Sequence, residues 1–254
     1  MKLTFLGSGS AFTTDGNYHS NILVERDGRR LLLDCGSDAR LSLNEIGLGY
    51  RDVEAVFVSH LHADHAGGLE WLGFTSHFDS ACERPDLYVS ADMADALWKN
   101  TLSGGMGSLG GGRADLNTFF KLHRVPRGGF FLWNGCRFQL VQTVHVNNGH
   151  ALSPCYGLFF RAGRRTVFLS GDTSFMPEQR MGLCEQADVV FHDCETSAAA
   201  SGVHPRYAEL CGLPEAVRAK TWLYHVNPGP LPDARADGFA GIVGKGQSFD
   251  FPES

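Results

Sequence analysis

The sequence predicts an α/β fold in which two packed mixed β-sheets form the core and helices cover their outer faces, an αββα sandwich. Short runs of β-branched and apolar residues recur along the chain, with turn residues between them. The early runs follow one another directly, whereas the later runs alternate with segments of helical periodicity. With 254 residues, 43% of them hydrophobic, the chain is long enough to bury a large core. We therefore expect a single domain over residues 1–254.

The elements follow from these patterns in chain order. Strands are expected at residues 2–6, 21–25, 30–34, 55–58, 87–89, 138–144, 156–161, 166–170, 189–192 and 221–224. Helices are expected at residues 39–46, 69–78, 91–99, 177–186 and 205–211. Asp27-Gly28 and Ala162-Gly163 are typical of hairpin turns. Residues 103–112 hold six glycines in ten positions, which predicts a mobile loop, either a plain connection or a flap over the functional site.

Composition restricts the partners and the compartment. A net charge of −6 gives no overall attraction to polyanions, which argues against bulk RNA binding. The seven cysteines are odd in number and form no Cys-x-x-Cys pair, as expected for reduced thiols in the cytosol. The first residues do not have the layout of a signal peptide, and no apolar run approaches the roughly 20 residues needed to cross a bilayer. We expect a cytoplasmic protein without a membrane partner.

The segment His60-Leu61-His62-Ala63-Asp64-His65 carries the strongest functional signal. It places three imidazoles and a carboxylate within six positions, in a chain with 11 histidines. Imidazole and carboxylate are the ligands that zinc and neighbouring first-row metals bind. The alternative is a polar turn that caps the next helix, but a cap needs one Ser, Asp or Asn rather than four ligands. We interpret the segment as a metal site.

The spacing within this segment predicts two ions. Side chains two residues apart in an extended stretch share a face, so His60 and His62 can bind one ion. Asp64 and His65 then turn toward a second position. A single ion takes about four ligands, so this segment and further ligands downstream exceed the needs of one ion.

The pattern His-x-His-x-Asp-His resembles the first metal motif of the metallo-β-lactamase superfamily of hydrolases, and the resemblance covers nearly the whole chain. The superfamily pattern continues with a histidine at a strand end, an aspartate in a Gly-Asp-Thr turn and a histidine that closes a final strand. His145, Asp172 and His225 occupy these positions in the expected order. The resemblance implies the metallo-β-lactamase fold and two ions that share one bridging carboxylate. The implied ligands are His60, His62 and His145 at one ion, Asp64, His65 and His225 at the other, and Asp172 between them.

Each downstream ligand has an alternative. His150 lies in the same loop as His145, but a strand end holds its side chain on the rigid part of the scaffold, which favours His145. Asp172 alone would be an ordinary turn residue, and His225 alone an ordinary core histidine. Their order along the chain favours the ligand roles.

Two close cations lower the pKa of a shared water and bind the oxygens of an ester under attack, so hydrolysis is the expected reaction.

Further motifs resemble the ribonuclease Z and cyclic phosphodiesterase branch. They are Phe5-Leu6-Gly7-Ser8-Gly9, Ser20-Asn21 and Leu33-Asp34-Cys35-Gly36. In ribonuclease Z an acidic residue and a later histidine act together beside the metals, and Asp193 and His204 fall at the matching places. A histidine oriented by a carboxylate can give a proton to a leaving alkoxide, so His204 is the expected general acid.

The remaining roles are as follows. A surface histidine beside the helix at 205–211 is the alternative for His204, and Asp193 could instead orient a ligand imidazole. We count Asp64 among the catalytic residues as well as among the ligands. His19 could reach a substrate, but an ordinary loop histidine is the preferred interpretation.

The expected substrate is a small phosphodiester, such as a cyclic nucleotide or a phosphoribosyl cyclic phosphate. The chain has no long arm of the kind that ribonuclease Z uses to hold tRNA, and its basic residues are dispersed, apart from residues 161–165. The alternatives are a lactone or thioester hydrolase, which does not need His204, a tRNA 3′-end endonuclease, and a non-catalytic member of the fold. Zinc is the expected metal, with manganese and iron as alternatives. The apolar C-terminal stretch is compatible with a homodimer.

Overall fold

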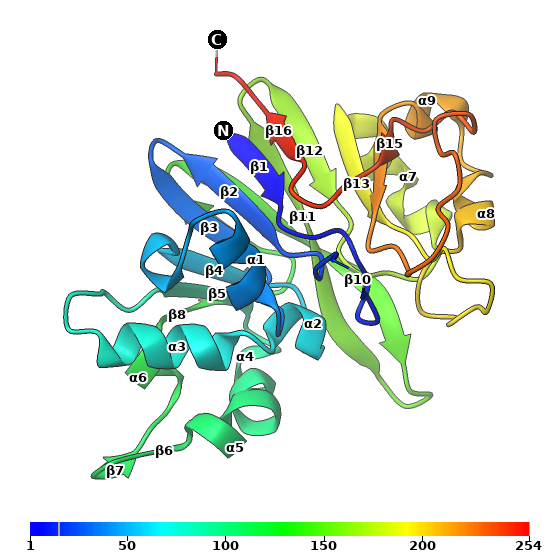
Figure 1. The fold of residues 1–254 in the computed structure, drawn as a ribbon. Coiled ribbons are helices and arrows are strands. Elements are labelled where there is room, and N and C mark those ends of the chain that lie inside the picture. Colours follow the sequence, from blue (N-terminus) through cyan, green and yellow to red (C-terminus); the bar gives the residue numbers. More distant parts are fainter. Residues whose placement is uncertain (15, 254) are drawn as a thin grey trace.

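The computed structural model describes residues 1–14 and 16–253. Over these residues the chain forms two seven-stranded sheets with helices on the outer sides, which confirms the predicted sandwich (Figure 1). Figure 1 places α1 and α3 beside the first sheet, and α7 and α9 beside the second. No helix in these two ranges is long and apolar enough to span a bilayer.

The first sheet has the strand order β16-β1-β2-β3-β4-β5-β8. Its strands are β1 (Lys2–Phe5), β2 (Ile22–Arg26), β3 (Arg29–Leu33), β4 (Ala55–Val58), β5 (Asp86–Ser90), β8 (Lys121–Val125) and β16 (Ser248–Asp250). The β2–β3 hairpin turns at Asp27 and Gly28, both with positive φ, as the Asp-Gly pair predicts. From β3 to β8 the pairing is parallel. Every residue of β4 is buried, as expected for a central parallel strand that is covered on both faces.

The second sheet has the strand order β15-β14-β13-β12-β11-β10-β9. Its strands are β9 (Phe130–Trp133), β10 (Cys136–Asn147), β11 (Leu152–Ala162), β12 (Arg165–Leu169), β13 (Val189–Asp193), β14 (Thr221–Tyr224) and β15 (Gly241–Ile242). The strands from β12 to β15 pair in parallel, so β12, β13 and β14 have their carboxyl ends at the same edge of the sheet. This edge carries much of the functional site.

Short helices occupy the connections. They are α1 (Ala39–Glu45), η1 (Tyr50–Asp52), α2 (Ala63–Ala66), α3 (Leu69–Phe78), α4 (Ala94–Ala96), η2 (Leu97–Leu102), α5 (Ser103–Met106), α6 (Leu116–Phe119), α7 (Pro177–Gln186), α8 (Tyr207–Leu210) and α9 (Glu215–Arg218). The bounds of α3 and α7 agree with the prediction. The helix expected at 91–99 instead begins at Ala94 and continues as the π-helix η2.

Aromatic side chains join the two sheets. The ring of Phe57, on β4, stacks on that of Phe131, on β9, with centroids 5.5 Å apart. Phe131 stacks in turn on Phe138 of β10 at 5.0 Å. Near the other end of the core, Phe5 of β1 and Phe191 of β13 lie 5.0 Å apart. Replacing a buried ring of this size by Ala costs about 3–5 kcal/mol of folding stability. These contacts therefore stabilise the packing of one sheet on the other.

The prediction of a mobile glycine-rich loop is wrong. Residues 103–106 form α5, and Ser108–Leu109 (β6) pairs with Gly112–Arg113 (β7) in a small hairpin. The buried side chain of Met106 packs on α3, where a Cβ on Gly73 would lie 2.8 Å from Cε of Met106. This packing keeps the segment on the α3 side of the first sheet (Figure 1).

Candidate metal centre

The carboxyl ends of neighbouring strands place three of the expected residues side by side. Asp172 follows β12, Asp193 ends β13, and His225 follows β14. Because these strands are parallel neighbours, their ends deliver the three side chains to one edge of the second sheet. His145 comes from the last part of β10, on the same sheet.

The histidine motif approaches from the first sheet. It follows the buried strand β4, and His62 is the residue at the N-terminus of the four-residue helix α2. Asp64 and His65 lie on α2 and are buried, as is His60, whereas His62 is exposed. The backbone N–H of Tyr156, on β11, donates to the carbonyl of Ser59 at 3.1 Å and so connects this turn to the second sheet.

His60, His62, His145 and Asp172 form the first group of ligand atoms. His62 Nδ1 lies 2.9 Å from His60 Nε2 and 3.2 Å from His145 Nε2. His145 Nδ1 donates to the carbonyl of Val203, and the single Ser59 hydroxyl proton goes to Asp34, so Ser59 Oγ accepts from His60 Nδ1. Both Nε2 atoms therefore carry lone pairs, and one proton on His62 can serve only one of them. A cation satisfies this convergence of lone pairs.

Asp64, His65, Asp172 and His225 form the second group. His65 Nε2 lies 3.1 Å from Asp64 Oδ2 and 3.3 Å from Asp172 Oδ2. His225 Nε2 lies 3.3 Å and 3.4 Å from the same two oxygens. Two buried carboxylates and two imidazoles thus face one another at distances typical of groups around a metal ion.

Asp172 belongs to both groups. Its Oδ2 also lies 3.7 Å from the Nε2 atoms of His60 and His145. The residue is 1% exposed, and its Oδ1 has no hydrogen-bond partner among the residues that the structure describes. A buried carboxylate oxygen without a donor is costly, and a bound cation would remove that cost. The donor set therefore fits divalent metal ions.

The electrostatics of the two groups favour a cation. Burial lowers the pKa of His60, His62 and His145, which keeps these imidazoles neutral, as metal ligands must be. Burial alone would raise the pKa of Asp172, but the imidazoles of His225 and His65 outweigh it and hold that pKa well below the usual range. Burial opposes charge on His65, but the carboxylates of Asp172, Asp64 and Asp34 raise its pKa well above the usual range. The buried carboxylates thus attract positive charge, which a bound cation would supply in place of the proton on His65.

Asp34 orients one of the ligands. Its Oδ2 accepts from His65 Nδ1 at 2.7 Å, and its two oxygens accept from the backbone N–H and the hydroxyl of Ser59 at 2.7 Å each. The residue follows β3 with a φ of 62°, which turns the carboxylate toward α2. No role for Asp34 was expected from the sequence, because its partner His65 lies 31 residues further along the chain. Carboxylate partners of ligand imidazoles fix the ring and increase its basicity.

Asp193 and His204 lie together beside the two groups. His204 Nδ1 donates to Asp193 Oδ2 at 2.8 Å, and the backbone N–H of Thr173 donates to the same oxygen at 3.2 Å. Burial opposes charge on His204, but the hydrogen bond to Asp193 and the charge of its carboxylate raise the pKa to about 9. An imidazole held protonated next to the metal ligands has the placement that a proton donor needs.

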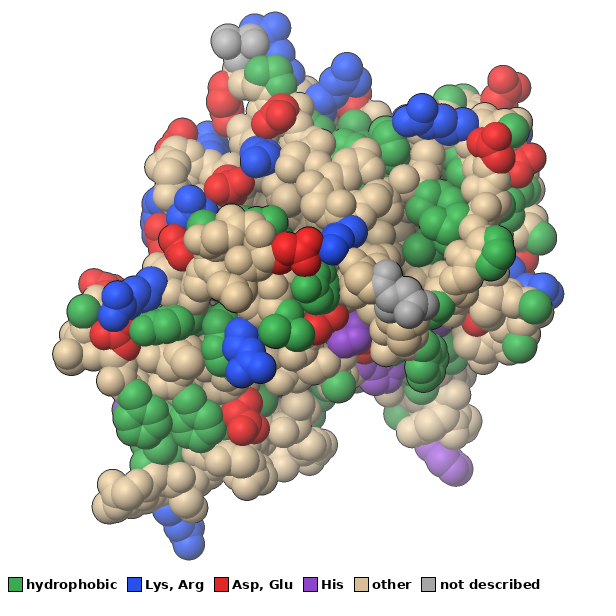
Figure 2. All heavy atoms as spheres, in the orientation of Figure 1, with side chains coloured by type: hydrophobic (Ala, Val, Ile, Leu, Met, Phe, Trp, Pro, Cys, Tyr) green, Lys and Arg blue, Asp and Glu red, His purple; other side chains and the backbone are tan. Residues whose placement is uncertain are grey.

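Several of the candidate ligands, together with His204, line a cavity of about 240 Å³. Its walls are formed by Ser10, Ala11, Phe12, His62, Asp64, His145, Asp172, Glu195, Ser201, Val203, His204, His225 and Asn227. Figure 2 shows histidine side chains near the centre of this face, with hydrophobic side chains beside them. The expected flap is absent from these walls: segments near residues 10–12 and 195–204 border the cavity, rather than residues 103–112.

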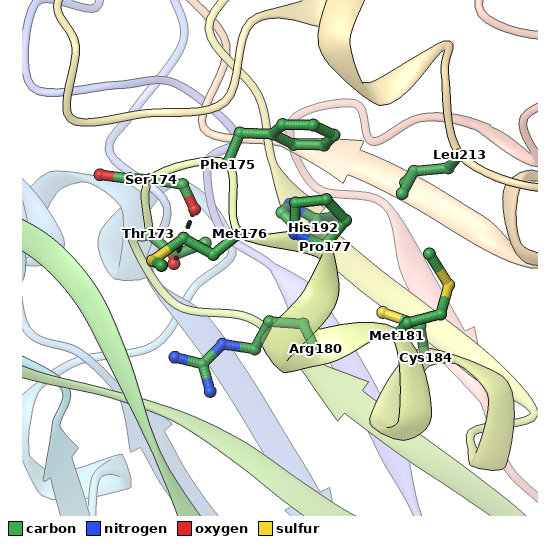
Figure 3. A pocket seen from close by; sticks show the side chains of 10 residues that line it. All are labelled: Thr173, Ser174, Phe175, Met176, Pro177, Arg180, Met181, Cys184, His192 and Leu213. Carbon is green, nitrogen blue, oxygen red and sulfur yellow. Dashed lines mark hydrogen bonds between the residues drawn. The ribbon is translucent and has the colours of Figure 1, made fainter.

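A second cavity lies beside the segment that follows Asp172. Figure 3 shows Arg180, Cys184, His192 and the residues that follow Thr173 around it. Its volume is about 10 Å³, room for about one water molecule. This second cavity is therefore too small for a substrate, whereas the cavity beside the metal ligands can hold one.

Two histidines named as alternatives lie elsewhere. His150 is exposed in the hairpin between β10 and β11. His19 Nδ1 lies 3.2 Å from Asp38 Oδ1, and its backbone N–H donates to the same carboxylate at 2.8 Å. Neither residue belongs to the described groups of ligand atoms or to the cavity wall.

Comparison with known proteins agrees with this geometry. Residues 1–249 match the family described as anti-Pycsar protein Apyc1. The anti-Pycsar protein Apyc1 of Paenibacillus harenae is 34% identical over 227 residues, which cover 89% of each chain. Among solved structures, the metallo-β-lactamase fold protein YhfI of Bacillus subtilis has a TM-score of 0.76 at 19% identity, with 98% of this chain and 99% of that chain covered. The short form of human tRNase Z has a TM-score of 0.72 at 18% identity, with 99% and 100% covered.

The likeness to YhfI confirms the metallo-β-lactamase fold that the motifs imply. The chain belongs to the anti-Pycsar protein Apyc1 family.

Proposed function

We propose that this protein is a phosphodiesterase that uses two divalent metal ions, zinc by preference, to hydrolyse small cyclic phosphodiesters of the cyclic mononucleotide class. One observation carries the proposal: two groups of His and Asp ligands share Asp172, and His204, which is hydrogen-bonded to the buried Asp193, lines the same cavity. The combination provides sites for two cations next to a proton donor, and phosphodiester hydrolysis can use both.

The residues that would hold the ions divide between the two groups. They are His60, His62 and His145 at one ion, Asp64, His65 and His225 at the other, and Asp172 at both. When bound, such ions supply an activated water and neutralise charge on the phosphoryl oxygens. Asp64 contributes to catalysis by keeping the second group negative, because its carboxylate is ionised and close to both imidazoles.

His204 would serve the leaving group. Its Nδ1 is engaged by Asp193, so its Nε2 is the nitrogen available to a substrate. A water oxygen adds to phosphorus, one P–O ester bond breaks, and the leaving alkoxide takes the proton from His204. Asp193 stabilises the protonated imidazole before this transfer and holds the ring in one orientation during it.

The cavity favours a small substrate. Its volume of about 240 Å³ is just below the range typical of pockets for small ligands. Among the residues that the structure describes, no Lys or Arg lines this cavity, so the charge of a phosphodiester would be met by the bound ions and by His204. Some basic side chains elsewhere are engaged in ion pairs, such as Arg29 with Glu54 at 2.6 Å and Lys121 with Glu83 at 2.6 Å. A folded tRNA needs several unpaired cations along its backbone.

A substrate panel tests the proposal. The purified protein is analysed for bound metals and assayed with cyclic mononucleotides, bis(p-nitrophenyl) phosphate, a lactone, a thioester and a precursor tRNA. The expected result is turnover of the cyclic phosphodiesters that is lost on chelation and restored by zinc. Turnover of the lactone or the thioester alone, or of the tRNA alone, would refute it.

A further inference from the structure

One large aromatic side chain borders the metal cavity and is nevertheless exposed. Phe12 is 78% exposed, yet its ring forms part of the cavity wall. A ligand that covers this ring would remove apolar surface from water, which stabilises the complex. Its place at the mouth of a site for a small substrate points to a ligand.

The turn that carries Phe12 is fixed to the site. The backbone N–H of Thr13 donates to the carbonyl of Ser10 at 3.0 Å, which makes Phe12 the third residue of a tight turn. The backbone N–H of Ser10 donates to the carbonyl of Val226 at 3.0 Å, next to the expected ligand His225. Gly9 permits this turn, because a Cβ there would lie 2.2 Å from Oγ1 of Thr13. The turn that carries the ring is therefore anchored to Val226, the residue that follows the expected ligand His225.

Two side chains in the outer wall, Glu195 and Asn227, already accept hydrogen bonds from the protein backbone. Glu195 is 5% exposed, and its two carboxylate oxygens accept from the backbone N–H of Ser201 at 2.9 and 3.0 Å. Asn227 Oδ1 accepts from the backbone N–H groups of Thr196 and Ser197 at 2.8 and 3.1 Å. These contacts hold the loop that carries His204. The part of a substrate beyond the phosphate would thus meet chiefly the apolar side chains Ala11, Phe12 and Val203.

We propose that Phe12 is the platform on which the base of a bound nucleotide stacks, so that it positions the substrate without taking part in the chemistry. The inference rests on the proposed function and specifies how the same site binds its substrate. Planar bases stack on aromatic rings whatever their hydrogen-bonding edges, and loss of such a ring weakens binding about five- to a hundredfold.

The experiment compares substrates with and without a base. Wild-type protein and Phe12→Ala, both loaded with zinc, are assayed with adenosine 3′,5′-cyclic phosphate and with methyl riboside 3′,5′-cyclic phosphate, which lacks a base. Equilibrium binding of both compounds is measured alongside turnover. Phe12→Ala is expected to raise KM and Kd for the adenosine compound about five- to a hundredfold, with kcat nearly unchanged, and to leave the base-free compound unaffected.

Three further variants identify the cause. Phe12→Trp should restore binding of the adenosine compound, whereas Phe12→Leu, which is apolar but has no ring, should not. Phe78→Ala is the matched control, because Phe78 is 72% exposed and lies at the end of α3, outside the cavity wall. This control should behave like the wild type with both compounds.

Each remaining outcome decides against the stacking role. An equal loss with both compounds would mean that Phe12 only supports its turn, and no loss with either would mean that the base does not reach it. Failure of the proposed function is distinguishable, because a metal-loaded protein that binds the adenosine compound through Phe12 without hydrolysing it would retain the stacking role. Absence of both binding and turnover in the wild type would overturn both proposals.

Discussion

The Nδ1 atom of His204 lies 2.8 Å from Oδ2 of Asp193, and the imidazole ring of His204 lies 4.8 Å, centroid to centroid, from the rings of both His145 and His225. The hydrogen bond to Asp193 thus holds His204 between His145 of one ligand group and His225 of the other. His204 is not itself among the ligands that the superfamily resemblance implies, so its removal should separate catalysis from metal binding.

Replacement of His204 by Ala should lower kcat for a cyclic phosphodiester by about 10²- to 10⁴-fold, because the leaving alkoxide loses its proton donor. Metal content, measured by elemental analysis, should remain that of the wild type. His150→Ala is the control, since that histidine is exposed in the hairpin between β10 and β11. A loss of metal in parallel with the loss of activity would show that His204 acts as a ligand instead.

Replacement of Asp193 by Asn should change the pH dependence of kcat/KM. Asp193 raises the pKa of His204, whereas burial opposes charge on this imidazole. A raised pKa keeps the acid protonated at higher pH, so activity should fall only as the pH rises through that pKa. Without the carboxylate, burial remains, and the alkaline limb should move to lower pH. A limb at the same pH in both proteins would exclude His204 as the titrating acid.

Replacement of Asp34 by Ala should weaken metal binding about 10- to 100-fold, because the ring of His65 loses the carboxylate that orients it. Competition with a chelator of known affinity measures the effect. Asp86→Ala provides a matched comparison, since Asp86 also accepts from a histidine, His123, at 2.6 Å, but on an exposed part of the first sheet. Equal metal affinities in the two variants would contradict the role of Asp34.

Removal of bound metal should lower the thermal stability of the protein. A ligand at about 100 times its Kd stabilises the native state by about 2.7 kcal/mol, and the buried carboxylates Asp64 and Asp172 would repel each other once the ions leave. Differential scanning calorimetry with and without a chelator measures the change in Tm. Asp172→Ala should reduce the difference. An unchanged Tm of the wild type after chelation would argue against a buried ion.

The sequence was sufficient for the long apolar elements and insufficient for short or edge elements. The polar residues Lys121, His123 and Arg124 conceal β8, which is an exposed edge strand held by its pairing with β5. The strand β15 has two residues, too few for a periodic signal. Residues 103–112 were misinterpreted because the packing of the buried Met106 on α3 holds this segment in place despite its glycines. Such contacts exist only in the folded chain.

The candidate site was predictable where its residues follow a fixed local pattern. The motif at 60–65 is contiguous, and His145, Asp172 and His225 each end or follow a strand, so the structure brings all seven together in the expected groups. Asp34, Glu195 and Phe12 were not assigned because their roles depend on what each of them faces. Those neighbours are far away in the sequence, and one sequence alone does not define them.

A titration of metal against activity tests the central claim most directly. Protein stripped with a chelator is assayed for hydrolysis of a cyclic mononucleotide while zinc is added, and bound metal is measured in the same samples. The account predicts no activity in the stripped protein and a plateau at about two ions per chain. Full activity in the stripped protein, or a plateau reached with no metal bound at the described His and Asp residues, would contradict it.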